Sequence, residues 1–334
     1  MYGYPLKTNP NLEKEKDKGN LFVFKDVVTP YPSTNENMKI IYSTWSSYDT
    51  VAWSSQPLFP AIFKKAGFKV ALLDFQATRS RSSFMFDFHC SFFINPIKIH
   101  KQCFDFRNDS IFQHDGDGLD IYMNNLFHFP KSLNIIHLQG QHLPSEAHFP
   151  KTPKWEKFKD TDILRPDLNE KQRMQIASYD NCTFYNDAVL KRVITSFAHE
   201  DAVLVYFSDH GEQLYDDSRN VYGRTFGIFS RERIKSINEI PFIIWVSDSY
   251  RKNHPDKLKL ISNAINRPFS NDDIPYLLLD LANIDFKGNK PERSVINQNF
   301  KSHDRILIEG NQKFNYDSNK EELDTIQMLI PYCK

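Results

Sequence analysis

The sequence predicts an α/β fold with a largely parallel central sheet flanked by helices, and two observations support this prediction. Short apolar runs, rich in β-branched and aromatic residues, alternate along the chain with longer amphipathic stretches, as in proteins built on a parallel sheet. The run Asp201–Ser208 places apolar residues side by side without strict alternation, which favours a strand buried on both faces. No internal repeat or linker interrupts the 334 residues, so we expect one domain over residues 1–334.

The first predicted elements follow a polar N-terminal segment. Met1–Asn20 combines two prolines with a charged run, which favours a loop followed by a short solvated helix. Leu21–Val28 predicts a strand and Asn35–Trp45 a helix, whose start at Ser33–Glu36 fits a capping box. Gln56–Ala66 is amphipathic and predicts a second helix, which a glycine ends.

The middle of the chain holds two more predicted strands, Phe68–Asp74 and Leu133–Leu138. Thr78–Cys90 is ambiguous, with a helix as one possibility. Asp115–Gly118 alternates aspartate with glycine and predicts a turn, because the further ligands of a Ca²⁺ loop are missing after it. Leu119–Phe127 should be helical.

The strongest helical pattern in the sequence is Glu170–Ala198. Before it, the lysine-rich Lys151–Lys159 predicts a surface segment. Gln213–Lys235 is long and polar with four arginines, and long loops beside a site often bind or cover substrate. The other predicted elements are a buried strand at Ile240–Val246, helices at Pro255–Ile265 and Asn271–Leu281, and a terminal hairpin of Arg305–Glu309 with Gln312–Asn315.

Residues able to do chemistry follow three of the predicted strands: Thr34, His142 and the pair Asp209-His210. In open α/β sheets, ligands bind beyond the carboxyl ends of the strands. Adjacent Asp and His side chains can share one metal ion, and a hydroxyl at a helix N-terminus lies where phosphate is favoured. The alternative at each position is structural: a solvated turn at Asp209-His210, a helix cap around Thr34 and an ordinary loop histidine at His142.

The composition excludes some classes of protein. Lys and Arg number 42, as do Asp and Glu, and a net charge of zero argues against a nucleic-acid-binding protein. No run approaches the ~20 apolar residues that cross a bilayer, and the start of the sequence lacks the pattern of a signal peptide. Without a Cys-x-x-Cys pair a cysteine-rich zinc site is not expected, while Cys90 and Cys103 are spaced for either a small disulfide loop or two thiols.

A series of motifs in this sequence resembles those of the soluble catalytic domain of bacterial phosphoethanolamine transferases, in the sulfatase and alkaline-phosphatase superfamily. The resemblance covers nearly the whole chain in order. The segments that carry it are Tyr2–Pro5, Thr8–Leu12, Phe24–Val28, Pro32–Thr34, Phe63–Phe68, Phe75-Gln76, His137–His142, Ser178–Asn181, Tyr185–Asp187, Ser208–Glu212 and Ile240–Phe242.

The resemblance implies an alkaline-phosphatase/sulfatase-like fold with a small C-terminal hairpin, and a role for each candidate residue. Thr34 would be the nucleophile that carries phosphoethanolamine covalently. Thr34, Asp209 and His210 would bind Zn²⁺, with Mn²⁺ or Mg²⁺ left open. His142 would contact the phosphate or the leaving group.

The resemblance also implies the partners and the location. The donor would be phosphatidylethanolamine, and the acceptor lipopolysaccharide (lipid A or a core sugar) or another envelope glycan. The catalytic domain would face the periplasm, held at the inner membrane by an N-terminal region that this sequence does not include.

Two departures from the family pattern limit what the resemblance implies. The family has a Gly-Glu-Ser segment before the motif at Tyr2–Pro5, and its glutamate is a metal ligand, so we expect the chain to be N-terminally truncated. Many members place another histidine about a dozen residues after the motif Ser208–Glu212, where this chain has Arg224, which suits phosphate oxygens. Two alternatives therefore stay open: another hydrolase of the superfamily (a phosphodiesterase or sulfatase), or a non-catalytic remnant. The Cys/Ser-x-Pro-Ser/Ala-Arg motif expected of a sulfatase is missing.

Overall fold

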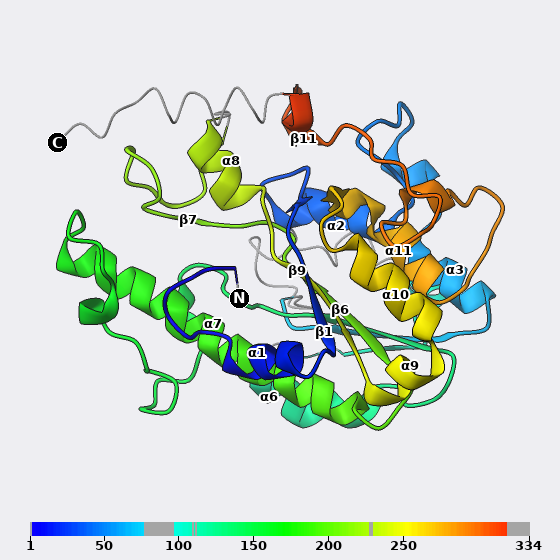
Figure 1. Cartoon of the computed structure of the whole chain (residues 1–334), viewed down its shortest axis with the longest axis horizontal. Helices are drawn as coiled ribbons and strands as arrows, with labels where there is room; N and C mark the ends of the chain where they lie inside the picture. Colours follow the sequence, from blue (N-terminus) through cyan, green and yellow to red (C-terminus); the bar gives the residue numbers. More distant parts are fainter. Residues whose placement is uncertain (1, 77–96, 109, 111, 227–229, 319–334) are drawn as a thin grey trace. The chain divides into compact units, whose positions relative to one another are not determined.

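The computed structural model describes residues 2–76, 97–108, 110, 112–226 and 230–318 (Figure 1). Its α-helices are α1 (Pro10–Asp17), α2 (Thr34–Tyr42), α3 (Phe59–Lys65), α5 (Ile97–Cys103), α6 (Asp115–Tyr122), α7 (Glu170–Phe197), α8 (Arg231–Ile237), α9 (Asp248–Asn253), α10 (Pro255–Ala264) and α11 (Ile274–Leu281). Its strands are β1 (Leu21–Phe24), β2 (Val27–Val28), β3 (Lys69–Asp74), β4 (Phe106–Arg107), β5 (Ser132–His137), β6 (Val203–Phe207), β7 (Gln213–Leu214), β8 (Tyr222–Gly223), β9 (Phe242–Val246), β10 (Phe269–Ser270), β11 (Ile306–Glu309) and β12 (Gln312–Asn315).

The chain divides into two compact units, and each is assembled from three stretches of sequence. Unit 1 consists of Met1–Phe22, Gly67–Val205 and Ile244–Pro255. Unit 2 consists of Val23–Ala66, Tyr206–Ile243 and Asp256–Lys334.

Parallel strands and covering helices confirm the predicted α/β class. In unit 1, β3 pairs in parallel with both β4 and β5. In unit 2, β2 and β10 are parallel, while β7–β8 and the predicted terminal hairpin β11–β12 are antiparallel. A further sheet has the order β1-β9-β6, so the pairing among the described residues is divided over five sheets rather than gathered in one.

The core of unit 1 forms where α6 and the long helix α7 cover β3. Leu73 and Phe75, Leu119 of α6, and Val189 and Val193 of α7 belong to one buried apolar cluster. The predicted helix over Glu170–Ala198 is confirmed as α7, whose 28 residues begin after a reciprocal cap between Asn169 and Gln172. In Figure 1, α1 lies along α7, and the Asp187 carboxylate on α7 accepts the backbone N–H groups of Asn11 (2.9 Å) and Leu12 (3.0 Å).

The core of unit 2 contains an aromatic group centred on Phe242. The Phe242 ring packs edge-on against Phe24 (centroids 5.2 Å apart) and Phe269 (5.4 Å), and it stacks on Phe207 (5.8 Å). Such aromatic pairs stabilise a core beyond the apolar area they bury. Because Phe207 is the last residue of β6, this packing fixes the point from which the Ser208–Glu212 motif leaves the strand.

The predicted turn at Asp115–Gly118 is wrong, because these residues open α6. Asp115 and Asp117 lie in the first helical turn, where acidic groups complement the helix dipole. The glycines are needed for close packing instead of for turning. A Cβ at Gly116 would lie 2.3 Å from the Tyr185 hydroxyl oxygen, and one at Gly118 would lie 2.6 Å from the Phe75 ring.

Two other local predictions near the N-terminus need correction. The strand predicted over Leu21–Val28 is two strands, β1 and β2, because the chain between them turns to Ile265, whose carbonyl accepts the Lys25 N–H at 3.0 Å. The capping box at the start of α2 does not form. Ser33 is the N-cap residue, but its hydroxyl donates to the Glu36 carboxylate instead of accepting a backbone N–H.

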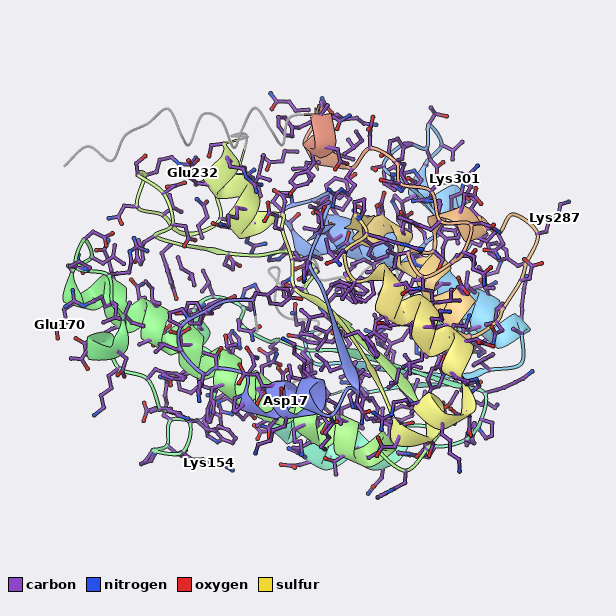
Figure 2. All side chains as sticks on the ribbon, in the orientation of Figure 1. Asp17, Lys154, Glu170, Glu232, Lys287 and Lys301 are labelled. Atoms are coloured by element: carbon purple, nitrogen blue, oxygen red, sulfur yellow. The ribbon has the colours of Figure 1, made fainter. Side chains whose placement is uncertain are left out.

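Three segments differ from their predicted environment. β6 is only half-buried along its length, since it lies at the end of its sheet in the described pairing, whereas the central strand β9 is fully buried. In Lys151–Lys159 the lysines are exposed, as Lys154 illustrates (Figure 2), but Trp155 packs against the core of unit 1 and Phe158 is buried. The polar stretch Gln213–Lys235, predicted as a long loop, contains β7, β8 and most of α8.

Some predictions fall outside the described residues. Thr78–Cys90 is among them, so the pairing of Cys90 with Cys103, itself buried, stays a prediction. No helix in the described part of the chain has both the length and the hydropathy to cross a membrane.

Candidate active site

The turn after β6 is pinned to its surroundings by backbone hydrogen bonds. The Ser208 N–H donates to the Pro241 carbonyl (3.3 Å) and the Gly211 N–H to the Ile237 carbonyl (2.7 Å), while the Ser208 hydroxyl donates to the His210 carbonyl. A Cβ on Gly211 would lie 2.0 Å from the Ser236 carbonyl oxygen, so only glycine allows this approach. The turn therefore presents Asp209 and His210 in a fixed orientation.

Asn37 ties this turn to the helix that carries Thr34. Its side-chain Nδ2 donates to the carbonyls of Asp209 (2.8 Å) and Tyr31 (2.6 Å), and its Oδ1 accepts the Thr29 hydroxyl (2.8 Å). Asn37 is completely buried. Because it lies one helical turn after Thr34 on α2, these bonds hold the two halves of the site together.

Thr34 is the first residue of α2, and its hydroxyl faces His210. Thr34 Oγ1 lies 3.1 Å from His210 Nε2. His210 Nδ1 lies 3.0 Å from the Gly211 carbonyl, which can only accept, so the proton belongs on Nδ1. The neutral imidazole then presents the lone pair of Nε2 toward Thr34.

These side chains fit a single zinc-sized ion. Asp209 Oδ2 lies 3.5 Å and Thr34 Oγ1 lies 3.1 Å from His210 Nε2. Two ligand atoms of a tetrahedral zinc ion, each bound at about 2.0–2.1 Å, lie roughly 3.3 Å apart. The described residues hold no group of three or more His, Cys, Asp or Glu side chains that could bind a metal ion, so an ion at this place would need the Thr34 hydroxyl as its third donor.

Arg224, the residue after β8, reaches the same imidazole. Its Nη1 lies 3.0 Å from His210 Nε2 and 3.1 Å from the Pro32 carbonyl oxygen. Its Nε lies 3.3 Å from Oε1 of Glu212, a buried carboxylate. Burial raises the pKa of Glu212, although the positive charge of Arg224 works in the opposite direction.

His142 belongs to unit 1, and its own surroundings are well defined. It follows β5 through Gln139 and Gly140, whose N–H groups donate to the Asp115 carboxylate (2.8 and 3.0 Å). His142 Nδ1 lies 2.7 Å from the Leu143 carbonyl, and its ring meets His148 edge-on at 5.9 Å. Burial and the neighbouring histidines lower the pKa of His148 to about 4, so His148 is neutral at pH 7.

Of the five residues predicted from the sequence, the structure brings Thr34, Asp209, His210 and Arg224 together in unit 2. Sequence reasoning missed the connecting residue Asn37. A polar residue on the buried face of the predicted helix was the available signal. The partner of Arg224, Glu212, belongs to the motif Ser208–Glu212 but had no assigned role.

Comparison with known proteins gives consistent matches. The model of the family described as Sulfatase matches residues 1–284. The phosphoethanolamine transferase EptC of Escherichia coli K12 is 30% identical over 326 residues, which cover 95% of this chain and 54% of EptC. The chain thus spans about half the length of the curated relatives it matches.

Solved structures agree with this similarity. The C-terminal periplasmic domain of Escherichia coli EptC superposes with a TM-score of 0.79 at 30% identity, covering 95% of this chain and 88% of that domain. A structure of the same domain in complex with Zn superposes equally well, at 29% identity. The alkaline-phosphatase/sulfatase-like fold expected from the sequence is therefore confirmed.

Proposed function

The chain belongs to the sulfatase family, and from this premise we propose that it is the catalytic part of a zinc-dependent phosphoethanolamine transferase. The observation that carries the proposal is the convergence of Thr34 Oγ1 and Asp209 Oδ2 on His210 Nε2, at 3.1 and 3.5 Å. A hydroxyl nucleophile beside two metal-binding side chains is the arrangement that phosphoryl transfer needs. The similarity to EptC, a named phosphoethanolamine transferase, supports the choice of transferred group.

The proposal extends to the whole protein. Units 1 and 2 would form one catalytic domain over residues 1–334, which the single family match across both units supports. The donor would be phosphatidylethanolamine and the acceptor lipopolysaccharide or another envelope glycan. The domain would act in the periplasm at the inner membrane, as the periplasmic domain of EptC suggests.

The proposed reaction consists of two displacements at phosphorus. In the first, a bond forms between Thr34 Oγ1 and phosphorus, the bond from phosphorus to the diacylglycerol oxygen breaks, and diacylglycerol leaves with a proton. In the second, an acceptor hydroxyl attacks the same phosphorus, its proton is released, and Thr34 leaves and regains its own. Zinc held by Thr34, Asp209 and His210 would lower the pKa of the Thr34 hydroxyl and offset charge on the phosphoryl oxygens.

The remaining residues position these groups. The N-terminus of α2, where Thr34 lies, favours an anion through its backbone N–H groups and dipole. Arg224 carries a permanent charge that can pair with phosphate oxygens, and His142 would contact the phosphate or the leaving group. Asn37 and Gly211 hold Thr34 and His210 in register, so the catalytic atoms need little rearrangement.

The test measures zinc content and intact mass after incubation with phosphatidylethanolamine vesicles. We expect about one equivalent of zinc and a phosphoethanolamine mass increment, with release of diacylglycerol. Thr34→Ala should abolish the increment, whereas the control Thr195→Ala, in an exposed threonine of α7, should keep it. An increment that persists in Thr34→Ala rules out Thr34 as the nucleophile. If the protein contained manganese or magnesium instead of zinc, the proposed identity of the metal would have to be corrected.

A further inference from the structure

We infer that Arg224 competes with the metal ion for the Nε2 lone pair of His210 and so weakens metal binding. This inference rests on the metal site of the proposed function. A neutral imidazole with its proton on Nδ1 offers one acceptor lone pair, at Nε2. The Arg224 guanidinium lies 3.0 Å from Nε2, next to the Thr34 hydroxyl at 3.1 Å, and donates to that lone pair, while a bound cation needs the same electrons.

Two further contacts hold Arg224 in this place. Its Nη1 also donates to the Pro32 carbonyl (3.1 Å), two residues before Thr34. Its Nε faces the buried Glu212 carboxylate at 3.3 Å. The Arg224 side chain is 22% exposed, so the contact with His210 belongs to a packed arrangement and not to a freely moving surface arginine.

Electrostatics adds to the competition. Arginine stays protonated at any pH at which the protein folds, so a metal dication entering the site meets a fixed positive charge. A metal ion can therefore bind Nε2 only after the guanidinium has moved away from it. Even then, the positive charge of Arg224 repels the bound ion. Replacing Arg224 should remove both costs, which makes the arginine a determinant of metal affinity.

The experiment titrates the metal-free protein with zinc alone against a chromophoric chelator at pH 7. Arg224→Gln should bind zinc about tenfold more tightly than the unmodified chain, or better, since a hydrogen bond from a charged donor is lost from Nε2. Arg219→Gln is the matched control, because Arg219 lies in the same segment but pairs with Asp217. Its zinc affinity should stay within about twofold of the unmodified chain.

Two further variants separate the possible causes of a gain. Arg224→Gln combined with Glu212→Gln should keep the gain, which excludes the freed Glu212 carboxylate as an added ligand. Arg224→Lys keeps the charge but offers one nitrogen for three contacts, so its affinity should lie between the unmodified chain and Arg224→Gln. If Arg224→Lys bound zinc with the same affinity as the unmodified chain, the positive charge alone would explain the effect. The proposed competition for the Nε2 lone pair would then be wrong.

A direct readout of the contact completes the test. The ¹⁵N resonance of His210 Nε2 in the metal-free protein should shift in Arg224→Gln and not in Arg219→Gln. Equal zinc affinity in the unmodified chain and Arg224→Gln overturns this inference alone and leaves the proposed function standing. Zinc binding by none of the variants overturns both.

Discussion

Unit 2 contains two groups of histidine, aspartate and arginine that look alike in composition and differ in what they can do. In the candidate active site, His210 donates through Nδ1 to a backbone carbonyl and keeps Nε2 as an acceptor. In a second group, the ionic cluster of Asp272, Asp273, Arg293 and His303, both nitrogens of His303 face acceptors, at 2.6 Å (Asp273 Oδ2) and 3.0 Å (the Asp304 carbonyl). The residue types are the same, but the hydrogen-bond partners differ. They leave Nε2 of His210 able to accept, as a metal ligand must, whereas they favour a protonated, cationic His303.

The charged side chains of the ionic cluster are held by one another and by Ser47. Arg293 forms an ion pair with Asp273, and the Asp272 carboxylate accepts the N–H and the hydroxyl of Ser47, both at 2.9 Å. Although burial raises the pKa of Asp272, Arg293 beside it brings that pKa below its ordinary value. The acidic and basic side chains of this cluster pair with one another. We therefore interpret the cluster as structural and the site around His210 as the candidate catalytic site.

The largest effect is expected when the histidine of each group is replaced in turn. His210→Ala should lose zinc binding and lower the rate of phosphoethanolamine transfer by about 10³-fold or more, because it removes the proposed metal ligand next to the proposed nucleophile. His303→Gln should keep its zinc content and its transfer rate per folded molecule. Zinc content and diacylglycerol release, normalised to folded protein, check both. If His210→Ala retained its zinc, the metal would have to bind at another place in the chain.

The next largest effect opens the ionic cluster. Arg293→Gln removes the guanidinium from two fully buried carboxylates, Asp272 and Asp273, of which Asp273 keeps His303 as a partner, so the free energy of unfolding should fall by about 3–5 kcal/mol. Urea unfolding followed by circular dichroism measures it. The matched control is Arg165→Gln, which removes an exposed pair with Asp167 and should change stability by less than about 1 kcal/mol. Similar losses in both variants would contradict a special role for the buried cluster.

A smaller effect is expected at Asn37, which connects the fold to the active site. Asn37→Ala leaves buried partners, among them the Asp209 carbonyl and the Thr29 hydroxyl, without its hydrogen bonds, and should cost about 1–3 kcal/mol of stability. Because the turn of Asp209 loses its tie to α2, zinc affinity should also fall, by about 10- to 100-fold. Calorimetric titration of the folded variant measures this fall. Unchanged affinity would mean that the backbone contacts of Gly211 suffice.

The sequence could predict what depends on local pattern, and it failed where distant residues decide. The apolar period and its end placed α7 to within one residue, and the order of strands placed Asp209-His210 beyond β6. The glycines of Asp115–Gly118 were interpreted as a turn, because the Tyr185 and Phe75 side chains that require them are distant in sequence. The same holds for Asn37, whose partner Asp209 is 172 residues away.

The smallest expected effect is the pH dependence of the ionic cluster. His303 is faced by Asp273, the Asp304 carbonyl and the Tyr48 hydroxyl, with Asp272 close by. Burial lowers the pKa of His303, but the Asp273 carboxylate outweighs it and raises the pKa from 6.5 to about 9. The folded state therefore holds a proton that the unfolded state releases, so this contribution to stability is complete below pH 6.5 and disappears as pH rises through about 9.

His303→Gln provides the reference for that pH dependence, because it removes the titrating group. The difference in the free energy of unfolding between the unmodified chain and His303→Gln should shrink by about 2 kcal/mol between pH 6 and pH 9.5, after allowing for partial exposure of the ring. Chemical denaturation of both proteins at half-unit pH steps measures it. A difference that stays constant over this range would mean that the pKa of His303 is the same in the folded and the unfolded protein. The contrast between the two histidines would then rest on the geometry around their ring nitrogens alone.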